Sequence, residues 1–136
     1  MAVVWLDHVN IRTTNLEPMR SFYVDVIGLE DGARPNFNFD GAWLYCGDRA
    51  AVHLVKTRRE YAGEDPKLEH FAFRTLDVAE AIERIEAHEV EYSIIDRPDI
   101  GVLQVNVYDP DGNHIELAFP PEESPDLPGK SRPDPS

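Results

Sequence analysis

The alternation of apolar and polar residues predicts a strand, a helix and then several short strands in the first part of the chain. Residues 3–11 alternate as in a strand, and the cap residues 12–15 precede apolar residues at three- and four-residue spacing. This spacing predicts a helix that ends at Gly28. Short apolar runs then fill residues 29–55, with turn signals at Asp31-Gly32, Asp40-Gly41 and Gly47-Asp48. Short strands joined by turns are therefore expected there.

The same order of elements begins again after a charged connector at residues 58–67. Residues 68–75 predict a strand, and Asp77 with Glu80 predicts a capping box that opens a second helix. Further strands are predicted at residues 92–95, 102–108 and 115–119. The last two are joined by Asp109-Pro110-Asp111-Gly112-Asn113, the strongest hairpin turn signal in the chain.

Individual residues also match between the two halves of the chain, at a nearly constant separation in the sequence. Leu6-Asp7-His8 matches Leu68-Glu69-His70 at an offset of 62 residues, and His53 lies over Glu116 at an offset of 63. An internal duplication explains both offsets. We therefore predict one α+β domain over residues 1–120, built of two pseudo-symmetric βαβββ modules at about residues 1–57 and 66–120.

The composition changes after the last predicted strand. From residue 120 onward the chain holds more than half of its 11 prolines, together with serine, aspartate and glutamate, and shows no apolar period. A segment of this kind cannot bury enough apolar surface to order itself. Residues 121–136 are therefore predicted to be a disordered tail.

Charge and composition exclude several classes of partner. A formal net charge of -13 and a pI near 4.6 repel nucleic acid phosphates and anionic lipid surfaces. The apolar runs are far shorter than the roughly 18 residues that suggest a membrane span. No secretory signal is visible at the start, and the single cysteine, Cys46, cannot form an internal disulfide. We expect a cytoplasmic protein.

Four polar residues lie on the strand face opposite the apolar one. Successive strand residues point to opposite faces, so each of the four opposes apolar neighbours suited to packing on a helix; they are His8, His53, His70 and Glu116. Imidazole nitrogen and carboxylate oxygen are ligands that divalent metals prefer. A lone strand histidine is usually structural, but four such residues at equivalent positions of a repeat predict a metal site.

Other residues of the same parity are candidates for contact with a substrate, namely Asn10, Gln104, Asn106 and Tyr108. They could orient a polar substrate or support the metal ligands, although structural hydrogen bonding would explain each of them equally well. Trp43 and Tyr45 share a strand and are more typical of a core. His114 has the parity of Glu116 but adjoins the turn, so it ranks below His53 as a ligand.

Several segments together resemble one family over roughly residues 1–120. They are Leu6-Asp7-His8-Val9, Phe22-Tyr23 with Gly28-Leu29-Glu30, Leu68-Glu69-His70, and residues 108–117, which run from Tyr108 to Leu117. This combination is similar to the vicinal oxygen chelate superfamily of glyoxalases, bleomycin resistance proteins and extradiol dioxygenases. The resemblance implies two βαβββ modules, a U-shaped mixed sheet around a cavity, and a divalent metal. His8, His70 and Glu116 match the family's ligands, whereas His53 stands where glyoxalase I typically has a glutamate.

The resemblance implies a metal-dependent lyase or isomerase of glyoxalase type, acting on a small substrate that chelates the metal through vicinal oxygens. Glu116 would be the catalytic base, since no second carboxylate is predicted at the metal. One zinc, nickel, cobalt, manganese or iron ion would suit the ligands. A homodimer is expected from the same analogy.

Three alternatives stay open at this point. An extradiol-type dioxygenase needs redox-active iron or manganese with open positions, and His53 would fill one of them. A thiol transferase acting on fosfomycin needs a dedicated anion site, which the sequence does not reveal. A binding protein that sequesters a drug or metabolite, as bleomycin resistance proteins do, usually lacks the metal ligands.

Overall fold

The computed structural model describes residues 5–58, 68, 70–98 and 101–126, and the chain divides into two compact units. The first unit comprises residues 1–62 and the second residues 63–136. The boundary lies within the predicted connector at residues 58–67. Each unit is a complete arrangement of strands and helices and is described by itself.

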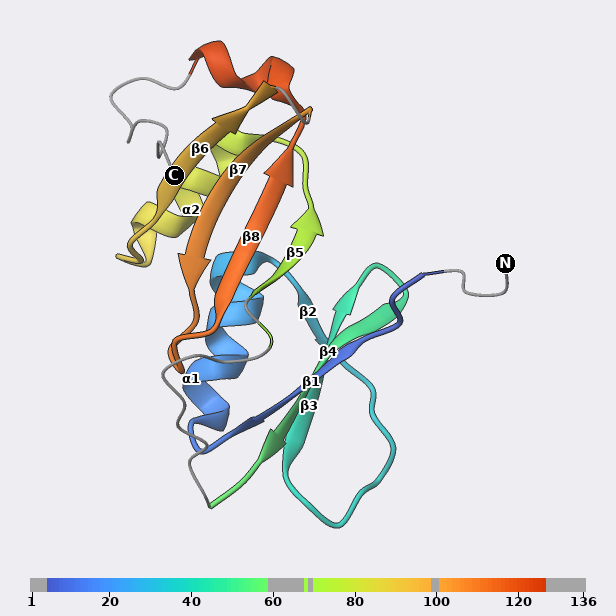
Figure 1. The fold of residues 1–136 in the computed structure, drawn as a ribbon. Coiled ribbons are helices and arrows are strands. Elements are labelled where there is room, and N and C mark those ends of the chain that lie inside the picture. Colours follow the sequence, from blue (N-terminus) through green and yellow to red (C-terminus); the bar gives the residue numbers. More distant parts are fainter. Residues whose placement is uncertain (1–4, 59–67, 69, 99–100, 127–136) are drawn as a thin grey trace. The chain divides into compact units, whose positions relative to one another are not determined.

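The first unit contains a four-stranded mixed sheet and a helix that begins as an α-helix and continues as a π-helix (Figure 1). The strands lie in the order β1-β4-β3-β2, with β1 parallel to β4 and the other neighbours antiparallel. The elements in chain order are β1 (Val9–Thr13), α1 (Leu16–Ser21), η1 (Phe22–Ile27), β2 (Glu30–Gly32), β3 (Gly41–Cys46) and β4 (Arg49–Lys56).

The second unit repeats this topology. Its strands lie in the order β5-β8-β7-β6, with β5 parallel to β8 and the remaining pairs antiparallel. The elements are β5 (His70–Arg74), α2 (Val78–Ala87), β6 (Ser93–Arg97), β7 (Val102–Tyr108), β8 (His114–Phe119) and the short helix η3 (Pro121–Asp126). The predicted α+β fold with two similar βαβββ modules is thus confirmed, whereas the U-shaped arrangement around a cavity stays a prediction.

The strand registers of the two units agree with the offsets found in the sequence. Asn10 lies level with His53 in the first unit, and Ala72 lies level with Glu116 in the second. The first members of these pairs are 62 residues apart and the second members 63. His53 and Glu116 therefore occupy equivalent positions of the repeat.

The apolar face of each sheet forms the core of its unit. In β4 the side chains of Val52 and Leu54 are buried, as are those of Ile115 and Leu117 in β8. Helix α1 contacts β3 and β4, and α2 lies against its own sheet (Figure 1). Since full burial of such a side chain contributes about 1.5–3 kcal/mol, this alternation fixes which face of each sheet remains polar.

Two elements near the N-terminus differ from the sequence prediction. Strand β1 begins at Val9 rather than at residue 3, and residues 1–4 lie outside the described residues. In the β1–β4 register, Leu6 would lie beside Arg49, the first residue of β4. Residues before Leu6 would therefore have no partner in β4. The predicted helix continues to Gly28, but η1 is a π-helix in which the Gly28 amide donates to the Tyr23 carbonyl five residues back. Gly28, with φ 98°, ends it as predicted.

The predicted turn at Asp31-Gly32 is wrong, because these residues belong to strand β2. Gly32 pairs with Trp43, and a Cβ at Gly32 would lie 2.7 Å from the ring of Tyr45. The Tyr45 hydroxyl donates a hydrogen bond to the Ala33 carbonyl at 2.5 Å. The glycine is therefore present to admit an aromatic ring, and not to form a turn.

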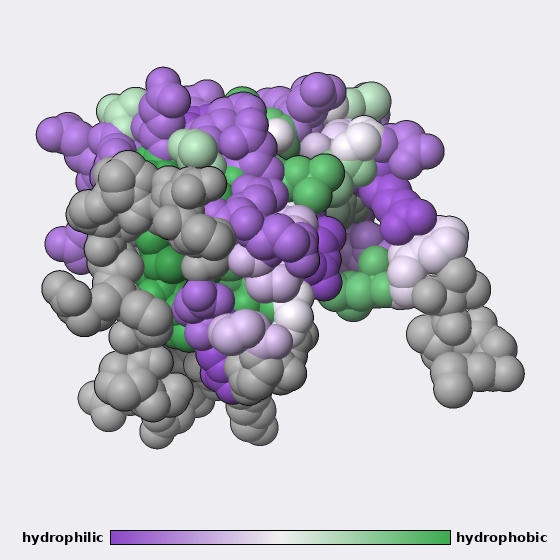
Figure 2. All heavy atoms as spheres, turned by 90° about the horizontal axis from the view of Figure 1, so that it is seen from above, coloured by the Kyte–Doolittle hydropathy of each residue, from purple (hydrophilic) through white to green (hydrophobic). Residues whose placement is uncertain are grey.

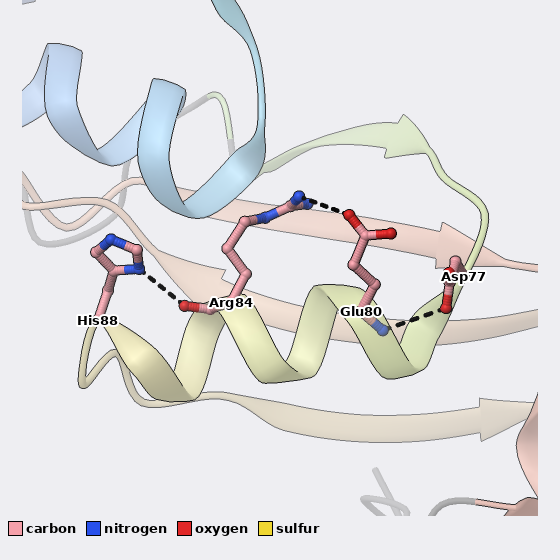
Figure 3. Close-up of polar contacts among 4 residues, drawn as sticks. All are labelled: Asp77, Glu80, Arg84 and His88. Carbon is pink, nitrogen blue, oxygen red and sulfur yellow. Dashed lines mark hydrogen bonds and ion pairs between the residues drawn. The ribbon is translucent and has the colours of Figure 1, made fainter.

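Helix α2 has only half of the predicted capping box. The Asp77 carboxylate accepts a hydrogen bond from the Glu80 amide at 3.2 Å, as predicted. The Glu80 carboxylate, however, accepts a hydrogen bond from the Arg84 side chain at 3.3 Å (Figure 3). It does not accept one from the Asp77 amide, as a full capping box would require. The reciprocal contact comes from Glu123, which accepts from the amides of Asp77 at 3.2 Å and Val78 at 2.5 Å.

That contact corrects the prediction of a disordered tail from residue 121. Residues Pro121–Asp126 form η3, which contacts β6 and β7 and brings Glu123 to the N-terminus of α2. Two backbone donors at a helix N-terminus compensate for ordering this segment. Residues 127–136, the remainder of the predicted tail, lie outside the described residues.

The turn before β8 forms as predicted. The buried Asp109 carboxylate accepts hydrogen bonds from the amides of Asp111 and Asn113 and from the Asn113 side chain. Gly112 has φ 86°, which favours glycine. This network fixes where β8 begins.

The surface agrees with the acidic composition. The face drawn in Figure 2 is mostly hydrophilic, with hydrophobic residues showing as smaller areas between the polar ones. Among the described residues, no helix is both long enough and apolar enough to span a membrane.

We expect Glu123→Ala to lower the free energy of unfolding by about 1 kcal/mol, because two amides of α2 lose their side-chain cap. Glu122→Ala is the matched control, since Glu122 is exposed on the same short helix, and it should change stability by less than about 0.5 kcal/mol. Urea unfolding monitored by circular dichroism measures both. Equal stability of the two variants would show that η3 does not cap α2 in solution.

Candidate metal and substrate site

Two of the predicted ligands meet on the polar face of the second unit. His70 opens β5, and Glu116 lies in β8 level with Ala72. The distance from His70 Nε2 to Glu116 Oε1 is 3.9 Å, and the Glu116 side chain is 16% exposed. This separation is too long for a hydrogen bond. Two donors that each lie about 2.1 Å from a tetrahedral metal are about 3.4 Å apart, so this pair would have to approach by about 0.5 Å to share a cation.

His114 and Asn106 extend the polar face beside this pair. His114 Nε2–H donates to Asn106 Oδ1 at 2.7 Å. The His114 ring lies 5.0 Å from that of His70 and stacks on Tyr108 at 5.1 Å. Asn106, opposite Glu116 in the β7–β8 register, is 8% exposed, and its Nδ2 is buried without a hydrogen-bond partner among the described residues.

The equivalent face of the first unit carries a stack of rings. His53 lies between His8 and Trp43, with ring centroids 3.9 Å and 4.1 Å away and both interplanar angles 11°. Phe37 lies 6.4 Å from Trp43 and stacks on Phe39 at 4.9 Å. This face of the first unit therefore carries a row of rings around His53.

His53 is the most constrained of the predicted ligands. It is 9% exposed, and its Nε2 lies 3.0 Å from the Ala50 carbonyl, to which a protonated Nε2 donates. Burial, and secondarily the neighbouring His8, hold the pKa of His53 below its ordinary value of 6.5; the Ala50 carbonyl and Asp7 act in the opposite direction. The neutral imidazole, the form that binds metals, is therefore favoured.

The orientation of the first pair differs from that of a ligated pair. Imidazole lone pairs lie in the ring plane, so two rings that share a metal must both have it in or near their planes. Stacked rings with centroids 3.9 Å apart do not meet this condition. His8 and His53 could bind one metal only after at least one ring turns, and His8 Nδ1 is held 2.7 Å from the Asp7 carboxylate.

Each unit thus contributes two of the four predicted ligands. Among the described residues, no group of three or more histidine, cysteine, aspartate or glutamate side chains is arranged to hold a metal ion. The donor types suit a borderline divalent metal. The second pair is close to the required separation, and the first is not yet in the required orientation.

The four predicted substrate contacts lie on these polar faces but differ in exposure. Asn10 is exposed and level with His53, Gln104 is half-buried, Asn106 is buried and Tyr108 is 60% exposed. Trp43 and His114, which the sequence ranks below the predicted ligands, lie beside them on these faces. A signal was present, since Trp43 and Asn106 are 63 residues apart, the offset between His53 and Glu116, and each opposes that partner in the register.

A cavity of about 470 Å³ in the first unit does not coincide with these residues. Three cationic side chains line it, Arg20, Arg34 and Lys56, together with Glu17 and Asp40. Arg20 pairs with Glu17 at 3.5 Å and with Asp31 at 3.4 Å. These two carboxylates offset the positive charge of Arg20.

Comparison with known proteins supports the topology. The model of the Glyoxalase/Bleomycin resistance protein/Dioxygenase superfamily matches residues 5–117. A glyoxalase family protein from Bacillus anthracis is 25% identical with a TM-score of 0.72, over 88% of this chain and 98% of that one. No curated protein matches the chain.

Two further solved structures share the fold. Lactoylglutathione lyase from Agrobacterium tumefaciens is 23% identical, with a TM-score of 0.66 over 88% of this chain and 96% of that one. An antibiotic binding protein from Streptomyces is 22% identical, with a TM-score of 0.63 over 88% and 98%.

In metal-free protein, we expect His53→Phe to reduce the loss of stability on acidification from about pH 7.5 to about pH 5. The pKa of His53 is lowered in the folded chain, so below pH 6.5 the unfolded chain binds the proton first, and acid favours unfolding. Phenylalanine keeps a ring between His8 and Trp43 but does not titrate. Urea unfolding across this range measures the difference. Parallel pH profiles for the two proteins would contradict the lowered pKa.

Proposed function

The chain belongs to the Glyoxalase/Bleomycin resistance protein/Dioxygenase superfamily, and we propose that it is a metal-dependent lyase or isomerase of glyoxalase type. Its substrate would be a small molecule that chelates one divalent metal through vicinal oxygens. The observation that carries this proposal is the approach of His70 and Glu116 to 3.9 Å on a polar strand face.

The proposed ligands are His8, His53, His70 and Glu116. Their support is the repeat, since His53 and Glu116 have equivalent positions in the strand registers. Three imidazoles and one carboxylate suit zinc, nickel, cobalt, manganese or iron. Losing one ligand should weaken the site without changing the fold.

The proposed chemistry is proton transfer between adjacent carbons of the substrate. The bound metal would stabilise negative charge on the substrate oxygens. Glu116 is the proposed base, because its largely buried carboxylate is the only one in the proposed ligand set. Asn10, Gln104, Asn106 and Tyr108 would orient the substrate. The homodimer and the cytoplasmic location expected from the sequence stay predictions.

A second candidate, an extradiol-type dioxygenase, has one observation in its favour. His53 is stacked between two rings and lies within hydrogen-bond distance of the Ala50 carbonyl, which is compatible with a purely structural histidine. The remaining triad of His8, His70 and Glu116 would leave positions open for a catechol and oxygen. The role of His53 therefore separates the two enzymes.

A binding protein is the third candidate, because an antibiotic binding protein shares this fold. The row of rings from His8 to Phe39 offers planar apolar surface for such a ligand. A protein of this kind would bind its ligand without turnover, and replacing Glu116 would affect binding far less than in an enzyme.

We expect His70→Ala and Glu116→Ala each to weaken zinc binding by roughly a hundredfold or more, because the loss of even an outer partner of a metal ligand weakens binding about 10–100-fold. His53→Ala should have a smaller effect, since a triad remains. His88→Ala is the control, because His88 hydrogen bonds to Arg84 at the end of α2 (Figure 3). Equilibrium dialysis of untagged protein with zinc measures this. Unchanged affinity in either of the first two variants would remove that residue from the site.

We expect turnover of the hemithioacetal of methylglyoxal and glutathione, with Glu116→Gln lowering kcat/KM by about 10²–10⁴-fold through loss of the base. Metal-loaded protein should be assayed with this compound, and in parallel with catechol under air and iron(II). Oxygen uptake with catechol would instead favour the dioxygenase. Tight binding of either compound without turnover would favour the binding protein.

A further inference from the structure

We infer that the side-chain amide of Asn106 donates a hydrogen bond to an oxygen atom of the bound ligand, beside Glu116. This inference deepens the proposed function and rests on it, because it assumes a ligand at the polar face of the second unit.

The two halves of the Asn106 amide are used differently. Its Oδ1 accepts from His114 Nε2 at 2.7 Å. Its Nδ2 carries two N–H donors, is buried, and has no hydrogen-bond partner among the described residues. Buried polar groups are almost always paired, so an unpaired buried donor indicates a missing partner.

Folding of the module does not require an amide here. Asn106 opposes Glu116 in the β7–β8 register, and Trp43 opposes the equivalent His53 in the β3–β4 register. In the first unit this position packs a ring at 4.1 Å on the histidine. Since the same topology accommodates a large apolar side chain, neither the fold nor the bond to His114 accounts for the unpaired Nδ2 donor of Asn106.

The position of the donor indicates what it would bind. Asn106 is level with Glu116, whose carboxylate lies 3.9 Å from His70. An N–H group recognises only acceptors. A ligand oxygen such as a carbonyl, an enolate, a hydroxamate or a carboxylate fits this chemistry, and a cation does not.

The test uses acetohydroxamate, which chelates metals through two vicinal oxygens, and zinc-loaded full-length protein. Asn106→Leu removes the donor while keeping a side chain of similar volume. We expect calorimetric titration to show affinity for acetohydroxamate about tenfold or more weaker than in the unmodified protein. Zinc affinity, measured separately, should remain within about twofold.

Two further variants sharpen the result. Asn106→Asp keeps an oxygen to accept from His114 but replaces the donor by an acceptor, and it should weaken acetohydroxamate binding at least as much. It also serves if the leucine variant does not fold. Ser93→Ala is the matched control, because Ser93 is an exposed residue paired with Asn106 on the neighbouring strand β6, and its affinity should not change.

Three results would overturn the inference. Equal affinity of the Asn106 variants and the unmodified protein for acetohydroxamate would refute this inference and leave the proposed function standing. Equal losses of zinc and acetohydroxamate affinity would assign Asn106 to supporting the metal ligands. Failure of the unmodified protein to bind zinc would overturn this inference together with the proposed function.

Discussion

The candidate site depends on the parallel pairing of the first strand with the last strand in each unit. This pairing needs a crossover connection through a helix, and it brings together residues that are more than forty positions apart. It sets Asn10 beside His53 and Ala72 beside Glu116. Strand alternation then directs the apolar neighbours to the helix side, so the polar residues remain together on the other face.

The two units use this common frame for different chemistry. In the first unit, His8, His53 and Trp43 form a stack in which the central imidazole is buried and its pKa is lowered. In the second, Glu116 and Asn106 place a carboxylate and an amide at the positions that correspond to His53 and Trp43. The two units thus share one fold but differ on their polar faces, as at the position shared by Trp43 and Asn106.

Much of the fold could be predicted from the sequence because its determinants are local. The helix stop at Gly28 and the hairpin turn held by Asp109 depend on residues within a few positions. The repeat also gave the register, since His53 and Glu116 occupy equivalent positions as the offsets indicated. These features need only periodicity, cap residues and turn residues.

The remaining features depend on contacts between distant segments. Glu123 replaces half of the capping box from 46 residues away. Gly32 pairs with Trp43 in a strand, and the Tyr45 ring leaves no room for a Cβ there. The stacking of His8 on His53 depends on ring orientation as well as on register. Residue parity predicted that these two side chains share a face, but it could not predict that their rings lie parallel rather than directed at a common point.

The metal centre proposed for this chain has three imidazole ligands and one carboxylate ligand. X-ray absorption spectroscopy of zinc-loaded protein tests this most directly, because scattering by imidazole rings distinguishes histidine from oxygen ligands. We expect four ligands at about 2.0–2.1 Å, of which three are imidazoles. A spectrum with oxygen ligands only, or with a single imidazole, would contradict it.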